Sequence, residues 1–293
     1  MSDSKFRIES DLLGEKQIPA DALYGVQTLR GLENFKISHF HLDEYPRYIQ
    51  GLAITKMGAA MANKELGLLT DEVYDAIMKA CEEVRDGKLD KHFPVDMIQG
   101  GAGTTTNMNA NEVIANRALQ IMGHEPGEHK IVSPNDDVNR SQSTNDAYPT
   151  AAHIGLYLTH LEFKKHFNAL IASLRAKESE FGDVLKMGRT QLEDAVPMTL
   201  GQTFGCFASI LQDEIKNLDA AAEEFLTVNM GATAIGTGIC SEPGYAEKCV
   251  AALSKITGFE FKLSSDLVGA TSDTSCLVGY SSALRRIAVK VGK

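Results

Sequence analysis

The chain has 293 residues and a formal net charge of -10, with no lysine-rich block. This acidic balance argues against nucleic acid or an anionic membrane as the main partner. No stretch of about 18 apolar residues occurs, and Met1 to Lys5 lead into charged residues, so we expect neither a transmembrane helix nor a signal peptide. The five cysteines are odd in number and lack CxxC spacing, which indicates reduced thiols in a cytoplasmic protein.

The first part of the chain predicts short strands followed by helices. Up to about residue 43 no helical period is sustained, and Ile8 to Val26 is broken by glycine and proline, which suits short strands and turns. Helical patterns follow at 48–66, 71–86 and 107–122. Thr70 can cap the second of these helices, and a glycine follows the end of the second and the third.

Beyond Asp146 the apolar residues recur at alternating steps of four and three. The first series is Leu156, His160, Phe163, Phe167, Leu170, Leu174, Lys177 and Phe181, and the second is Phe204, Phe207, Leu211, Ile215, Leu218, Ala222, Phe225 and Asn229. A seven-residue repeat predicts long helices packed side by side. Further helices are expected at 243–257 and 272–293.

These patterns predict a mainly α protein with two domains. Residues 1–141 are expected to form a smaller, mostly helical N-terminal domain with short strands. Residues 142–293 are expected to form a central domain that is a bundle of long helices.

Hydroxyl and amide side chains gather in four separated stretches: residues 100–109, 133–136, 141–146 and 188–191. Most of these stretches precede a segment with a helical pattern. Neutral donors at helix N-termini are suited to a small carboxylate. None of the four stretches supplies an obvious base.

The glycine-rich loop at 100–109 is not a nucleotide motif. A dinucleotide fingerprint would need glycine at position 106, where Thr106 stands, and the GK[ST] of a P-loop is missing. A flexible turn with one hydroxyl cap is the simpler interpretation. It accounts for one threonine but not for three in a row followed by two asparagines, so a carboxylate site is the competing hypothesis.

The other stretches also have structural interpretations. Ser143 with Asp146 resembles a capping box, although Asn145 could also donate two hydrogen bonds to a carboxylate. The stretch 188–191 fits an inter-helix loop, with Gly188 closing the preceding helix. His160 lies on the repeat face and is expected to be packed. The histidines show no HExxH or paired ligand spacing, so no catalytic metal is expected.

Three motifs resemble the aspartase/fumarase superfamily, and within it the aspartate ammonia-lyases. They are GAGTTTNMNANE at 101–112, SQSTNDAYPT at 141–150 and MGRTQLEDAVPMTLGQ at 187–202, and the likeness extends from Tyr24 to Gly238. Fumarases usually have SSND followed by Thr-Phe, and GRTH, at the places where this chain has STNDAY and GRTQ.

The resemblance implies a three-domain protomer in a homotetramer, with each active site assembled from three subunits. By motif match the substrate-binding residues would be Thr104, Ser143, Thr144, Asn145, Thr190 and Gln191. Ser133 to Asp136 would match a loop that forms a second anion site in fumarases. No cofactor and no metal are implied.

The family's catalytic base is a serine in a GSSxMPxKxN loop, and that motif is absent from this sequence. The catalytic residue is therefore expected beyond Lys293, and residues 1–293 are expected to lack turnover on their own.

The implied reaction is the reversible elimination of ammonia from L-aspartate to give fumarate through an enediolate. Thr144 and Asn145 could face either a carboxylate or the amino group of the substrate. Two alternatives to this function remain open: a fumarate hydratase, and a non-catalytic fragment that serves as an oligomerisation or binding module.

Overall fold

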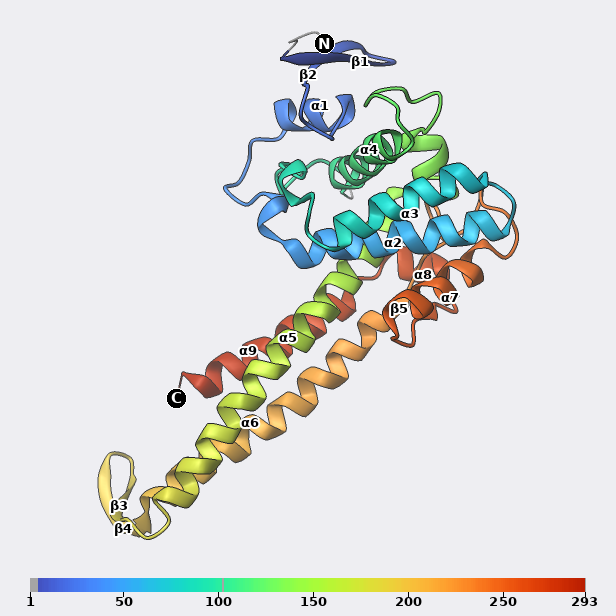
Figure 1. Cartoon of the computed structure of the whole chain (residues 1–293). Coiled ribbons are helices and arrows are strands. Elements are labelled where there is room, and N and C mark those ends of the chain that lie inside the picture. Colours follow the sequence, from blue (N-terminus) through green and yellow to red (C-terminus); the bar gives the residue numbers. More distant parts are fainter. Residues whose placement is uncertain (1–4, 102, 293) are drawn as a thin grey trace. The chain divides into compact units, whose positions relative to one another are not determined.

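The computed structural model describes residues 5–101 and 103–292. Ala102 of the glycine-rich loop lies outside the described residues, as do Met1–Ser4 and Lys293. The expected mainly α fold is confirmed, and Figure 1 follows its elements in chain order. The chain forms two compact units, residues 1–156 with 226–273 and residues 157–225 with 274–293. The expected domain division at residue 142 stays a prediction.

The first unit begins with two short strands and a helix. β1 (Phe6–Asp11) pairs antiparallel with β2 (Gly14–Pro19), and Asp11 stands opposite Gly14 at the turn. The φ of Gly14 is 110°, a conformation that glycine adopts without a steric penalty. α1 (Val26–Asn34) follows.

Four further helices of this unit lie within a few residues of the predicted ranges. They are α2 (Pro46–Glu65), α3 (Asp71–Arg85), α4 (Thr104–Ile121) and α7 (Tyr245–Thr257). The Thr70 hydroxyl caps α3 by accepting a hydrogen bond from the Val73 N–H at 3.3 Å. α4 begins at 104, earlier than the pattern predicts, because Gly103 turns the chain into the helix with a φ of 88°.

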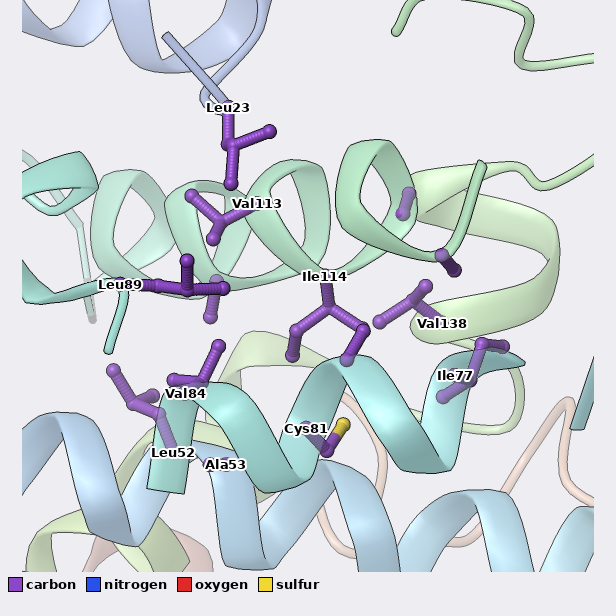
Figure 2. Close-up of a cluster of buried hydrophobic side chains, with 14 of the residues drawn as sticks. Leu23, Leu52, Ala53, Ile77, Cys81, Val84, Leu89, Val113, Ile114 and Val138 are labelled. Carbon is purple, nitrogen blue, oxygen red and sulfur yellow. The ribbon is translucent and has the colours of Figure 1, made fainter. Parts of the chain in front are cut away.

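The core of the first unit lies between α2, α3 and α4. Figure 2 shows Ile77 and Val84 of α3 on the side towards Ile114 of α4, Cys81 of α3 on the side towards α2, and Val113 turned towards Leu23. Each of these side chains is buried. Their burial is the main source of stability for this unit.

Glycine allows α2 to lie directly against the first turns of the next long helix, α5 (Thr144–Glu180). A Cβ on Gly51 would overlap the Ala151 carbonyl, and one on Gly155 would stand 2.8 Å from the Arg47 carbonyl oxygen. The opposing glycines bring the two helix backbones into contact. Lys56, further along α2, reaches Asn139 and Gln142 in the segment just before α5.

The second unit contains the rest of α5, with α6 (Leu200–Glu223) and α9 (Ser275–Val291). Leu211, Ile215 and Leu218 of the predicted repeat are buried. α6 packs on α9, and the buried Glu214 carboxylate pairs with Arg286 at 3.0 Å and with Lys290 at 2.7 Å.

Besides the start of α4, three predicted boundaries were wrong. The helix expected to reach residue 229 ends at Glu223, because the chain passes through a 3-10 turn and then forms β5 (Thr227–Val228), parallel to β6 (Lys262–Leu263). The helix expected from residue 272 begins at Ser275 and is separate from α8 (Leu267–Ser272). Gly188 does not close a helix. It lies in a hairpin of β3 (Leu185–Thr190) and β4 (Glu193–Thr199).

No helix in the described ranges combines the length and apolarity needed to cross a bilayer.

Candidate functional site

The N-termini of α4 and α5 meet in the first unit. Gly103, just before α4, packs so closely on the Tyr148 ring of α5 that a Cβ would overlap the ring. The Asn107 side-chain NH2 donates to the Thr144 hydroxyl oxygen at 3.3 Å. Polar stretches 40 residues apart in sequence are thereby brought together at the positive ends of two helix dipoles.

The three consecutive threonines of α4 have different surroundings. The Thr106 hydroxyl accepts a hydrogen bond from the Gln99 amide at 2.8 Å, and the Thr106 N–H donates to the Gln99 oxygen at 2.9 Å. Thr105 packs its methyl group against Gly31. Thr104 is exposed at the first position of the helix. Of the three, Thr104 is the residue placed to meet a ligand.

Ser143, Thr144 and Asn145 are half-buried at the start of α5. The Ser143 oxygen accepts from the Asn145 N–H at 3.3 Å, which leaves its hydroxyl hydrogen for another partner. The Asn145 NH2 donates to the Ala234 carbonyl at 2.7 Å. One of the two Asn145 amide hydrogens is thus used within the protein, and the other is left for a ligand.

Asp146 ties this turn to the loop at 229–236. Its carboxylate is buried and accepts hydrogen bonds from the N–H groups of Ser143 at 2.9 Å, Gly231 at 3.2 Å and Thr233 at 2.9 Å. Burial raises the pKa of Asp146 to about 6, opposed by these N–H groups and by the charge of Lys56. The bond from the Ser143 N–H to the Asp146 carboxylate is one of the two bonds of the predicted capping box. In place of the second, the Ser143 hydroxyl oxygen accepts from the Asn145 N–H and not from the Asp146 N–H.

Lys56 of α2 is fully buried behind the same turn. Its ammonium donates to the side-chain oxygens of Asn107 at 2.8 Å, Asn139 at 3.0 Å and Gln142 at 2.8 Å. Burial lowers the pKa of Lys56 to about 7, and the charge of Asp146 opposes that shift. We call Lys56 with these three amides the Lys56 network.

A cavity with polar side chains in its lining opens beside Ser143. Its volume is about 390 Å³, and its lining includes Ser143, Thr233, Asn139, Gln142, Arg140 and Asp136. The lining holds one guanidinium, Arg140, and one carboxylate, Asp136, and the Ser143 hydroxyl is a further donor, so the cavity can take a small anion. Within the described ranges, no three His, Cys, Asp or Glu side chains gather in a way that could hold a metal ion.

The loop at 133–136 is organised by its own side chains. The Ser133 hydroxyl accepts from the Asp136 N–H at 3.0 Å, and Asp137 accepts from the Ser133 N–H at 2.7 Å. These contacts close the turn Pro134–Val138 and place two carboxylates at its start.

Thr190 and Gln191 belong to the second unit, where they occupy the tip of the β3–β4 hairpin and are exposed. The two-residue turn has a φ of 50° at Gln191 and 71° at Leu192. Both central residues of a type I′ turn need positive φ, which is usually met by Asn-Gly. A non-glycine pair in this conformation is strained, a feature that often marks functional loops.

Lys56, Asn139 and the loop at 229–236 were not predicted from the sequence as contributors to the site. Gln142 and Asp146 lie in the predicted stretch 141–146, but their contacts with Lys56 and with the loop were not predicted. A signal for Lys56 is visible in the sequence, because it stands within the apolar run Leu52–Met57 of a helix. A charged residue on a buried helix face requires polar partners. The amides that supply them come from distant segments, which only the fold brings together.

The chain matches a protein family whose model is described as a lyase, over residues 14–293. It is 53% identical to an aspartate ammonia-lyase of Pseudomonas aeruginosa over 288 residues, and 50% identical to an aspartate ammonia-lyase of Escherichia coli over 291 residues. These alignments cover 98% and 99% of the chain, and 61% of each relative. The chain thus spans about three fifths of the length of these curated relatives.

Two solved structures share the fold. The fumarate lyase:delta crystallin from Brucella melitensis, bound to cobalt, superposes with a TM-score of 0.95 at 49% identity, covering 97% of the chain and 62% of that structure. The class II fumarase from Schistosoma mansoni gives 0.91 at 33% identity, covering 97% and 63%.

Proposed function

The chain belongs to the lyase family of the aspartase/fumarase superfamily, and from this premise we propose that it is part of an aspartate ammonia-lyase, which eliminates ammonia from L-aspartate to give fumarate. The observation that carries the proposal is the cluster of neutral donors at two adjoining helix N-termini, formed by Thr104 and by Ser143 to Asn145.

The chemistry of the elimination calls for such donors. The proton that leaves L-aspartate lies next to a carboxylate, and its removal places a second negative charge on that carboxylate, as an enediolate. Preorganised hydrogen-bond donors stabilise charge where it develops and cost no reorganisation at that moment. Thr104 and Thr144, at helix N-termini, supply hydroxyl donors, and the helix dipoles add their positive ends.

Thr190 and Gln191 are proposed to complete the site from the hairpin of another copy in a homotetramer. Their exposure and the strained turn support a role in which they meet a partner outside their own unit. Exposed apolar side chains on the helices of the second unit support assembly; they include Leu170 at 41%, Val278 at 63% and Val289 at 69% exposure.

We propose further that the base lies outside the 293 residues. Thr104 and Ser143 to Asn145 supply donors. Of the two carboxylates nearby, Asp136 accepts from the Ser133 hydroxyl at 3.1 Å, and the buried Asp146 is occupied by three N–H groups. Residues 1–293 are therefore expected to bind substrate groups without turning substrate over.

A fumarate hydratase is the alternative, because the class II fumarase shares the fold at 33% identity. The two reactions share the enediolate and differ in the leaving group. The 50–53% identity to aspartate ammonia-lyases favours ammonia elimination.

Turnover distinguishes the two activities. The protein encoded by the whole reading frame is expected to release fumarate, followed by its ultraviolet absorbance, from L-aspartate and not from L-malate. Residues 1–293 assayed alone are expected to release none. Release from malate only would make the protein a fumarase, and release from aspartate by residues 1–293 would show a base within them. Light scattering on the same samples tests for four copies.

A further inference from the structure

We propose that Lys56 is a positioning residue that holds the Thr144 hydroxyl as a hydrogen-bond donor, and so assigns Thr144 to a carboxylate of the substrate rather than to its amino group. The assignment to a substrate group rests on the proposed function, whereas the orientation of Thr144 follows from contacts within the first unit.

The first step is the direction of three amides. An ammonium group can only donate, so the side chains that contact Lys56 must present oxygen to it. Asn107, Asn139 and Gln142 do so at 2.8, 3.0 and 2.8 Å. Three acceptors match the three hydrogens of the ammonium. The NH2 group of each amide therefore faces away from Lys56.

The second step is what those NH2 groups contact. Gln142 donates to the carbonyls of Val138 at 2.9 Å and Arg140 at 3.1 Å, and Asn139 donates to the carbonyl of Gln142 at 3.3 Å. These bonds fix the backbone that leads into α5. Asn107 donates to the Thr144 oxygen at 3.3 Å and to the Asn139 oxygen at 3.1 Å.

The third step is the hydroxyl of Thr144. Its oxygen accepts the hydrogen bond from Asn107, so its single hydrogen remains for a partner on the other side. A carboxylate accepts that hydrogen, whereas the ammonium of L-aspartate offers only donors. If the Asn107 amide were rotated so that its oxygen faced Thr144, the Thr144 hydroxyl would donate to that oxygen and would have no hydrogen left for a substrate carboxylate. Lys56 prevents the reversal, because it requires the Asn107 oxygen.

The test replaces Lys56 with methionine, which keeps the length of the side chain and removes the charge. Lys64→Met is the matched control, because Lys64 lies on the same helix but is half-buried and paired with Asp71. Fumarate and L-aspartate binding are measured by calorimetry. Lys56→Met is expected to weaken both about tenfold, the loss expected for a hydrogen bond to a charged group, and Lys64→Met neither. Wild-type affinity with Lys56→Met overturns the proposal while leaving the function intact.

Thr144→Val separates the two assignments. Loss of affinity for fumarate and L-aspartate alike places Thr144 on a carboxylate, since fumarate has no amino group. A loss confined to L-aspartate contradicts the proposal. Combining Thr144→Val with Lys56→Met is expected to weaken binding no further than either change alone, because both remove the same donor.

Asn107→Asp provides a second variant if Lys56→Met does not fold. The carboxylate keeps an oxygen on Lys56 and forms an ion pair with it, but its other oxygen makes Thr144 donate inward. Fumarate affinity is expected to fall about tenfold. Unchanged affinity in a folded Asn107→Asp protein would count against the proposed orientation.

A pH series adds a readout that a purely structural lysine would not move. Fumarate affinity is expected to fall as pH rises through about 7, where the lowered pKa of Lys56 places the loss of its charge. Its titratable neighbours are Asp146, with a pKa of about 6, and two buried thiols, Cys81 and Cys249, whose raised pKa values keep them neutral in this range. In Asn107→Asp, Thr144 donates inward whatever the charge of Lys56, so this fall near pH 7 is expected to disappear. An unchanged fall in that variant contradicts the proposal.

If wild-type protein bound no fumarate, the proposed function would be wrong and the binding tests could not be used. The positioning role of Lys56 can then be measured without ligand. The Asn107 side-chain NH2 protons, assigned by NMR with Asn107→Asp, are expected to exchange slowly with solvent in wild type and Lys64→Met and faster in Lys56→Met. Equal exchange in all three proteins would overturn the positioning role.

Discussion

Asp146→Ala is expected to destabilise the first unit by about 3 kcal/mol or more, because three N–H donors lose a buried acceptor and each such loss costs roughly 1–3 kcal/mol. The three donors belong to Ser143, Gly231 and Thr233, so the change releases both the start of α5 and the loop at 229–236. Urea denaturation followed by circular dichroism measures the free energy of unfolding.

Asp75→Ala is the control for this prediction, since Asp75 is exposed on α3. An exposed substitution of this kind is expected to change the free energy of unfolding by no more than about 0.5 kcal/mol. If Asp146→Ala were as mild as Asp75→Ala, Asp146 would not be the clamp between the two segments.

Glu112→Ala, in α4, is expected to have an effect of similar size. The Glu112 carboxylate accepts hydrogen bonds from the N–H groups of Gly25 at 2.8 Å, Gln27 at 2.7 Å and Thr28 at 3.0 Å, and from the Thr28 hydroxyl at 2.6 Å. It thus caps α1 from another helix. Its removal leaves buried donors unpaired, at a cost of about 3–5 kcal/mol.

Hydrogen exchange locates this effect. Amides of α1 are expected to lose protection in Glu112→Ala while those of α3 retain it, and Glu82→Ala, at an exposed position on α3, is expected to change neither. Normal protection of α1 in the Glu112→Ala protein would show that the cap is dispensable. Burial raises the pKa of Glu112 against the effect of these hydrogen bonds, so the carboxylate depends on all of its partners.

The sequence predicts the helices well where local signals act. Thr70 and Gly87 bound α3 as expected, and the seven-residue repeat identifies α5 and α6. It fails at the end of α6, where residues 227–228 leave the helix to pair with residues 262–263. That pairing is a tertiary contact that no local pattern records. The hairpin tip at Gln191 and Leu192 also lacks the glycine that would have revealed its turn.

The candidate site is also predictable only in part, because local patterns show its residues but not their tertiary contacts. Hydroxyl and amide residues before helices indicate an anion site, and Thr104 and Ser143 to Asn145 lie at helix N-termini as the pattern predicts. The roles within the cluster depend on partners far away in sequence. The Gln99 amide donates to the Thr106 hydroxyl, and the Ala234 carbonyl accepts one amide hydrogen of Asn145. The Lys56 ammonium fixes the orientation of the Asn107 amide. The substrate-binding roles of Thr104, Ser143, Thr144, Asn145, Thr190 and Gln191 stay predictions.

The central claim is that the adjoining N-termini of α4 and α5 bind a carboxylate. Hydrogen–deuterium exchange of residues 1–293, with and without saturating fumarate, tests it most directly. Fumarate is expected to slow exchange at 104–107 and 143–146 and to leave the amides of α3 unchanged. If fumarate protects neither segment, or protects only amides elsewhere in the first unit, these helix N-termini are not the substrate site.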